Sequence, residues 1–277
     1  MNGYDELKIY RGCDIPITKK VIVTQPTLDQ IVEFGESDYF GSIHVLTSVG
    51  ADLKAQLWEA GIDYTTIDDY DLFLDFIQYV LGSHKLEYYE IVTNDEARDE
   101  YIKLYGVDEL EELKKNPVEL ILKGIDFSDF QVFTHKDSNQ RILYNADDDI
   151  TIDKLVYHQM VDAVRKIHGF TRNNEMPANE RTKMDLIQDA QDELLALQNK
   201  TDKQSTLLPM ISALTVKTGQ CGNDNIWNMP IAQFMDNFKR ATKIQHAELL
   251  LQGAYAGFAD IKGVSTSDLN WAGDLDK

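Results

Sequence analysis

Cysteine is scarce in this sequence of 277 residues, which contains only Cys13 and Cys221. Neither stands in a Cys-x-x-Cys or mixed Cys/His spacing, so the sequence offers no zinc ligand set and no redox pair. Two isolated cysteines are also too few for a fold held together by disulfides. We therefore expect two unpaired thiols. As an alternative, Cys221 beside Gly222 would be a nucleophile if it stood at a helix N-terminus, where the pKa of a thiol falls.

Long apolar runs are also missing. The run from Leu72 to Leu81 contains Asp75 and Gln78, and it is well short of the roughly 20 apolar residues that cross a bilayer. Residues 1–5 do not combine a basic stretch with an apolar one, which is the pattern of a secretion signal. We therefore expect a soluble, cytosolic protein.

Motifs of common enzymes are absent. No GxGxxG, GxSxG or P-loop pattern occurs, and the six histidines are scattered. The densest carboxylate cluster, Asp147-Asp148-Asp149, would hold Ca²⁺ or Mg²⁺ if its loop bent the three side chains inward. It lacks the glycine spacing that makes such a bend, and Asp149 stands where a helix entry favours negative charge. We expect a solvated loop and a non-enzymatic protein without metal or cofactor; an enzyme would have to use these aspartates and Cys221.

Positive charge is in short supply as well, because 27 Lys and Arg face 47 Asp and Glu, a net charge of −20. The excess lies in the first 150 residues, where 13 Lys and Arg stand against 31 Asp and Glu. A field of this sign repels nucleic acid and anionic lipid, and it favours a basic partner or serves only solubility. An acidic decoy that imitates the phosphates of DNA and blocks a nuclease is a further alternative.

Apolar residues make up 43% of the chain, enough for real cores, and the pattern predicts an α+β fold in three parts. Residues 1–85 form the first part, an acidic α+β domain. Residues 7–10 and 20–23 read as strands of a small antiparallel sheet. Thr27 is the expected N-cap of the following helix, with Gln30 as its capping-box partner. Further helices are predicted over residues 38–46, 52–60 and 69–81.

Residues 86–150 form the second part, an acidic α/β insertion or subdomain. Here Glu87 to Val92 reads as a strand, and the charged residues 96–105 and 108–115 read as helices. Residues 130–134 and 141–144 flank a polar turn and predict a hairpin.

Residues 151–277 form the third part, a helical domain. Thr151 or Asp153 is the expected cap of a helix that ends at Gly169, and helices over residues 181–198 and 206–218 follow. A long helix begins behind Pro230, because apolar residues recur at helical spacing from Ile231 to Phe258. Apolar residues of this part provide the core and a candidate surface for a partner: Phe234, Phe238, Leu251, Phe258 and Trp271.

Two series of residues resemble known phage proteins. The first series is Ile15-Pro16-Ile17, Gln25-Pro26-Thr27-Leu28, Phe34-Gly35-Glu36, Asp38-Tyr39-Phe40 and Gly61-Ile62-Asp63-Tyr64. It is similar to proteins of tailed phages and prophages of Gram-positive bacteria. The second series is Gly253-Ala254-Tyr255-Ala256-Gly257, Asp260-Ile261-Lys262-Gly263 and Leu269-Asn270-Trp271. It resembles the end of morphogenesis proteins of the tail assembly chaperone kind.

The resemblance implies a non-enzymatic protein of the host cytoplasm that binds tape-measure or tail-tube protein during virion assembly. The acidic charge predicts no nucleic-acid partner and no membrane partner, and self-association stays open. A structural tail or baseplate subunit that stays in the virion is the alternative within the same class.

Overall fold

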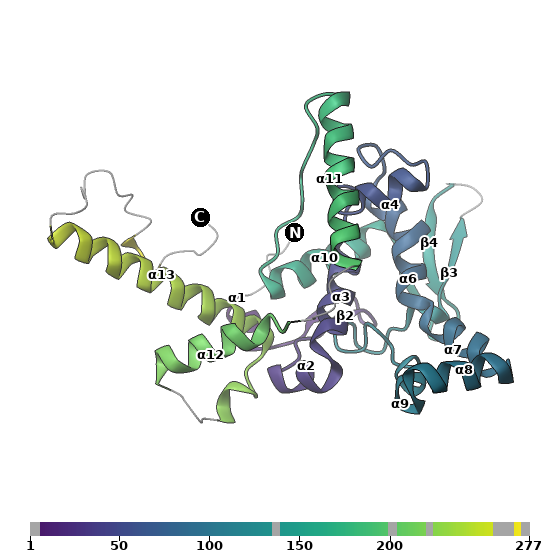
Figure 1. The fold of residues 1–277 in the computed structure, drawn as a ribbon, viewed down its shortest axis with the longest axis horizontal. Helices are drawn as coiled ribbons and strands as arrows, with labels where there is room; N and C mark the ends of the chain where they lie inside the picture. The colour runs from purple at the N-terminus through teal and green to yellow at the C-terminus, as the bar shows by residue number, and fades with distance from the viewer. Residues whose placement is uncertain (1–5, 135–138, 199–203, 220–223, 257–268, 273–277) are drawn as a thin grey trace.

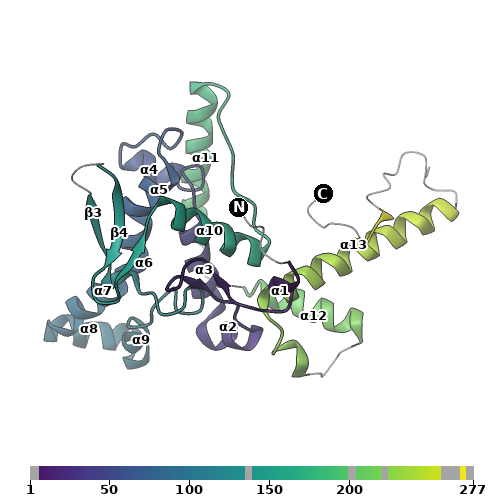
Figure 2. The same cartoon turned by 180° about the vertical axis from the view of Figure 1, so that it is seen from behind.

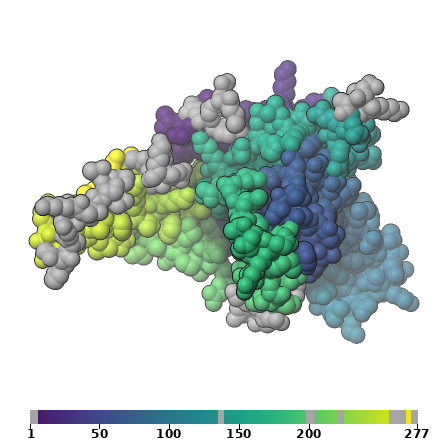
Figure 3. Space-filling model, turned by 90° about the horizontal axis from the view of Figure 1, so that it is seen from above, coloured from purple at the N-terminus to yellow at the C-terminus, as the bar shows by residue number. Residues whose placement is uncertain are grey.

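A computed structural model of the chain describes residues 6–134, 139–198, 204–219, 224–256 and 269–272. The fold is α+β, as predicted, with two small antiparallel sheets and a helical C-terminal half. Most elements form one body, and the last two long helices extend from it as an arm (Figures 1 and 2). Seen from above, the arm protrudes from one end of the body (Figure 3).

The first part of the chain is mostly helical. Its elements are α1 (Glu6–Tyr10), β1 (Ile15–Pro16), β2 (Ile22–Val23), α2 (Leu28–Phe34), α3 (Glu36–Thr47), α4 (Lys54–Glu59), α5 (Asp69–Leu72), the π-helix η1 (Phe73–Ile77) and α6 (Gln78–Gly82). The capping box is confirmed, since the Thr27 hydroxyl accepts from the Gln30 amide and the Gln30 side chain accepts from the Thr27 amide. The strand predicted at residues 7–10 is wrong, because these residues form α1 and bury only Ile9.

The middle part also contains more helix than predicted. Its elements are α7 (His84–Val92), α8 (Asp95–Tyr105), α9 (Val107–Glu112), the 3-10 helix η2 (Phe127–Asp129), β3 (Gln131–Thr134), β4 (Arg141–Asn145) and β5 (Ile150–Ile152). The hairpin is confirmed as β3 and β4, and β5 adds a third antiparallel strand. The strand predicted at Glu87 to Val92 is wrong, because these residues belong to helix α7, which packs on α8.

The C-terminal half is helical, as predicted. Its elements are α10 (Lys154–His168), α11 (Glu180–Gln198), α12 (Leu207–Thr218), the 3-10 helix η3 (Asp224–Ile226) and α13 (Ile231–Tyr255). Asp153 caps α10 by accepting from the Val156 amide at 2.9 Å, and Gly169 ends α10 in the left-handed conformation. The described part of α13 ends before Phe258, which lies outside the described residues.

One core cluster contains residues from all three predicted parts of the chain. Helix α10 passes through it and contacts α3, α5, β5 and α13. The ring of Tyr157 on α10 stacks on Phe73 of η1 with centroids 4.6 Å apart. The Tyr70 hydroxyl donates to the Ile152 carbonyl at 2.8 Å, which ties α5 to β5. The division of the chain at residues 85 and 150 stays a prediction.

Candidate partner-binding groove

The base of α13 is fixed to the body through backbone hydrogen bonds. The Ile231 amide donates to the Pro26 carbonyl at 3.0 Å, and the Leu28 amide donates to the Met229 carbonyl at 3.1 Å. These bonds join the entry of α13 to the entry of α2, two segments about 200 residues apart in the sequence. The first turn of α13 is therefore held by the N-terminal part of the chain.

Side chains continue this attachment along the next two turns. The Tyr10 hydroxyl of α1 donates to the Asn237 side chain at 2.9 Å, and the Lys239 ammonium group donates to the Gly169 carbonyl at 3.2 Å. Beyond these contacts α13 leaves the body (Figure 1). A helix of this length spans ~37 Å at about 1.5 Å per residue. Its second half therefore projects as the outer part of the arm.

The N-terminus of α12 is held by one carboxylate of the body. One oxygen of Glu36 accepts from the Thr206 amide and hydroxyl, each at 2.7 Å, and from the Leu207 amide at 2.9 Å. The other oxygen accepts from the Ser205 hydroxyl at 2.5 Å. Burial raises the pKa of Glu36, but these hydrogen bonds outweigh burial and hold the pKa below its ordinary value. The carboxylate therefore caps α12 together with Ser205, whose hydroxyl accepts from the Leu208 amide at 2.9 Å.

Replacing Glu36 with alanine is expected to destabilise the attachment of α12 by about 1–2 kcal/mol, the usual cost of a lost N-cap. Because the pKa of Glu36 is lowered on folding, this contribution is present above the carboxyl's ordinary pKa and is lost as pH falls through the folded value. Hydrogen exchange of the α12 amides measures the effect. Glu36→Gln is the matched control, since its amide oxygen still accepts; equal protection of α12 in the wild type and Glu36→Ala would contradict the capping role.

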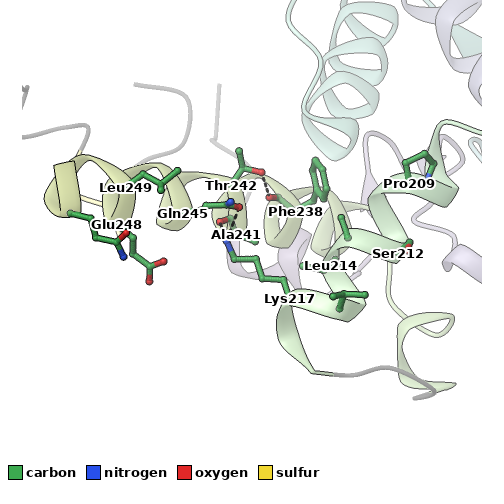
Figure 4. A pocket seen from close by; sticks show the side chains of 13 residues that line it. Pro209, Ser212, Leu214, Lys217, Phe238, Ala241, Thr242, Gln245, Glu248 and Leu249 are labelled. Atoms are coloured by element: carbon green, nitrogen blue, oxygen red, sulfur yellow. Dashed lines mark hydrogen bonds between the residues drawn. The ribbon is translucent and has the colours of Figure 1, made fainter. Parts of the chain in front are cut away.

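A groove with a volume of about 870 Å³ runs between α12 and α13 (Figure 4). The Lys217 ammonium group bridges the two helices by donating to the Ala241 carbonyl at 2.9 Å and the Gln245 side chain at 3.2 Å. Most of the lining surface is apolar, and Glu248 adds a carboxylate toward the outer end. The apolar side chains of the groove are Pro209, Ala213, Leu214, Val216, Phe238, Ala241 and Leu249.

The predicted partner-binding residues divide between the core and the arm. Phe234 is fully buried at the base of α13, and Phe238 is half-buried and lines the groove. Leu251 is 37% exposed on the outer half of α13. It does not line the groove, although the next residue in the sequence, Gln252, does. Trp271 is 53% exposed, and its carbonyl accepts from the Arg240 guanidinium at 2.8 Å. Of the five predicted residues, only Phe238 lines the groove among the parts that the structure describes.

The α12 wall of the groove was missed at the sequence level. A signal for it exists, because α12 carries apolar residues on more than one face: Leu214 is buried, whereas Leu208 and Val216 are 64% and 68% exposed. A helix that is apolar beyond the width of one buried face has a second contact to make. Of the two exposed residues, Val216 lines the groove, whereas Leu208 is not among the residues that line it.

The aspartate triplet lies in the turn between β4 and β5. The Asn145 side chain accepts from the amides of Asp147 and Asp148 at 2.9 and 3.1 Å, and Asp149 forms an ion pair with Lys20 at 3.1 Å. The lysine lowers the pKa of Asp149. Among the described residues, no group of three or more His, Cys, Asp or Glu is placed to hold a metal ion. Cys221 lies outside the described residues, and Cys13 is a free thiol.

Two searches with the whole chain, one of curated proteins and one of solved structures, found no match. None of the helices in the described residues has the length and apolar character to cross a membrane. A model of protein families matches residues 199–276 and is described as the second domain of YomV. The matched residues include α12 and α13 and therefore both walls of the groove. The YomV family is phage-associated, and the match indicates a phage protein.

Proposed function

We propose that this chain is a non-enzymatic phage tail assembly chaperone, which binds tape-measure or tail-tube protein in the α12–α13 groove while the virion is assembled in the host cytoplasm. The observation that carries the proposal is the position of the groove. An apolar groove open along the arm lies in the part of the chain that is similar to a phage-associated family. The choice of a tail protein as the occupant comes from the sequence resemblance described above.

The dimensions and chemistry of the groove suit an amphipathic helix of the client. Such a helix places apolar side chains at steps of three and four residues, which matches an apolar groove between two helices. Lys217 and Glu248 border the groove and offer charges to the polar edges of the helix. The acidic first half of the chain carries most of the net charge and keeps a complex with an apolar client soluble.

Mass spectrometry of purified particles, compared with the crude producing lysate, tests the role. An assembly chaperone is abundant in the lysate and absent from particles. Presence in particles at a fixed copy number would identify a structural tail or baseplate subunit and reject the chaperone role.

Replacing Val216 and Leu249 together by glutamate is expected to reduce co-purification of the client at least about tenfold, because two carboxylates would have to be buried against an apolar helix. Both side chains are more than half exposed in the free protein, so folding is expected to change little. Quantitative affinity purification from infected cells measures the effect. Leu195→Glu is the control, because Leu195 is 57% exposed on α11, away from the groove. Equal recovery of client with the groove variant would reject the groove as the client site.

A further inference from the structure

Helices α7, α8 and α9 form a second outlying part of the molecule, which we call the acidic module (residues 84–112). The module lies at the end of the body opposite to the arm (Figures 1 and 2). Helix α7 packs on α8, and α8 packs on α9, but no residue of α7 or α8 is buried. In α9 only Leu110 is buried. Two helices of nine and eleven residues thus contribute nothing to the core.

The module carries ten carboxylates and three cationic side chains. Two of the three cations are engaged close by. Lys85 pairs with Asp126 and Asp129 outside the module at 3.0 and 2.9 Å, and Arg98 pairs with Asp95 at 2.9 Å. Glu111 and Glu112 pair with Lys114 and Lys115, which follow the module, at 2.6 and 3.0 Å. Carboxylates still outnumber cations here, so this end of the molecule keeps a negative field. Such a field attracts a basic partner and repels nucleic acid and anionic membrane.

Large apolar side chains are exposed among these carboxylates. Leu86 and Tyr89 of α7 are 67% and 59% exposed, and their spacing of three places them on one face of the helix. Leu104, Tyr105 and Val107 are 65%, 62% and 56% exposed around the junction of α8 and α9. Because a helix that serves only solubility needs no such side chains, this surface has the composition of a binding face.

Acidic and apolar groups are interleaved on this surface. The rings of Tyr101 and Tyr105, one turn apart on α8, have centroids 4.8 Å from each other. Partial burial raises the pKa of Tyr101, and the negative charges of Glu87 and Glu109 raise it further. Negative charge on α7 and α9 therefore acts on an aromatic pair of α8.

We propose that the acidic module is a docking surface for a basic amphipathic helix of a partner protein. Lysine or arginine side chains of that helix pair with the carboxylates, and its apolar face covers the exposed leucine, valine and tyrosine side chains. The complementarity of charge selects the partner, and the apolar contacts stabilise the complex. The surface is separate from the α12–α13 groove, so this proposal does not depend on the function proposed for the groove.

The probe is a labelled synthetic helix of about 14 residues, with leucine on one face and lysine on the other, titrated with the full chain by fluorescence anisotropy. Binding is expected to weaken at least about tenfold in the variant Glu87→Gln, Glu90→Gln, Glu109→Gln. Separately, Leu86→Ser with Leu104→Ser is expected to weaken it by about five- to tenfold. A scrambled peptide of the same composition is expected to bind at least about tenfold more weakly than the amphipathic one.

The matched control is Glu59→Gln, Asp185→Asn, Asp189→Asn, which removes the same three charges from exposed positions outside the module. The control is expected to change affinity less than about threefold, because exposed charges beyond a Debye length are screened. Equal weakening by the control and module variants would overturn the proposal, since binding would then follow net charge alone. Equal binding of the scrambled peptide, or no effect of the two serine substitutions, would also overturn it.

Discussion

Replacing Phe234 with alanine is expected to destabilise the protein by about 3–5 kcal/mol, the usual cost of truncating a buried phenylalanine. The side chain is fully buried and belongs to the core cluster described above. It lies one helical turn after Pro230, next to the point at which backbone hydrogen bonds join the start of α13 to the segment before α2. A cavity at this point would loosen the arm from the body as well as reduce packing. Urea unfolding followed by circular dichroism measures the change.

Leu251 provides the control on the same helix. It is 37% exposed on the projecting half of α13, so Leu251→Ala is expected to change the free energy of unfolding by less than about 0.5 kcal/mol. If Phe234→Ala cost no more than Leu251→Ala, the base of α13 would not be part of the core. The two variants therefore distinguish the two roles predicted for this helical face, which are core packing at its base and a surface for a partner at its outer end.

Burial changes along α13, and this explains why the sequence predicted the helix but not which part of it is buried in the body. The apolar spacing is regular from Ile231 onward, and such spacing predicts one helical face. In the structure Ile231 is fully buried, Phe238 is half-buried and Leu251 is partly exposed. Periodicity carries no information on where a helix leaves the body, because that depends on contacts with distant segments.

Local signals in the sequence were reliable where the physics is local. The capping box of Thr27 and Gln30 spans three residues, and the stop at Gly169 needs only a left-handed backbone. The two errors in strand assignment have a common cause. Residues 7–10 and 87–92 contain tyrosine, isoleucine or valine, which favour strands, but the packing of α1 on α13 and of α7 on α8 overrides that preference.

The groove depends on contacts that no local pattern contains. Glu36 at the start of α3 caps α12, which begins 171 residues later at Leu207. The sequence predicts a partner surface on the C-terminal helices, and Phe238, one of the residues named for it, lines the groove because it shares the apolar face of α13. The opposite wall of the groove could not be predicted without the position of α12. The Glu36 carboxylate and the Lys217 bridge set that position.

The acidic module and the groove lie at opposite ends of the molecule and differ in chemistry. The groove is apolar and lies in a half of the chain with nearly balanced charge, whereas the module is strongly acidic. One chain therefore has room to contact two partners at once. Under the two proposals made above, an apolar client segment binds at the arm and a basic partner binds at the module, and the two do not compete.

Acidification is expected to reduce stability through His168, the buried histidine at the end of α10. Its Nδ1 lies 2.7 Å from the Val164 carbonyl, and its Nε2 lies 2.8 Å from the Tyr39 hydroxyl. A carbonyl only accepts, so Nδ1 carries the proton, and Nε2 accepts from the hydroxyl of Tyr39. Burial lowers the pKa of His168 to about 4, although the hydrogen bond to Val164 acts in the opposite direction.

The direction of the pH effect follows from this lowered pKa. Above the ordinary pKa of 6.5 the imidazole is neutral in the folded and the unfolded chain, and stability is unaffected. Between pH 6.5 and about 4 the unfolded chain binds a proton that the folded chain does not bind. Stability therefore falls as pH falls, by about 3 kcal/mol when pH 4 is reached.

Urea unfolding of the wild type and His168→Gln, at about pH 7 and about pH 4.5, isolates this contribution from that of the carboxylates. The variant is expected to be less stable near neutrality, because Tyr39 loses its partner, but to lose about 2–3 kcal/mol less on acidification. His44→Gln, at an exposed position on α3, is expected to keep the wild-type pH dependence. Equal losses in the wild type and His168→Gln would mean that His168 takes up its proton in the folded chain as readily as in the unfolded chain, and would reject the lowered pKa.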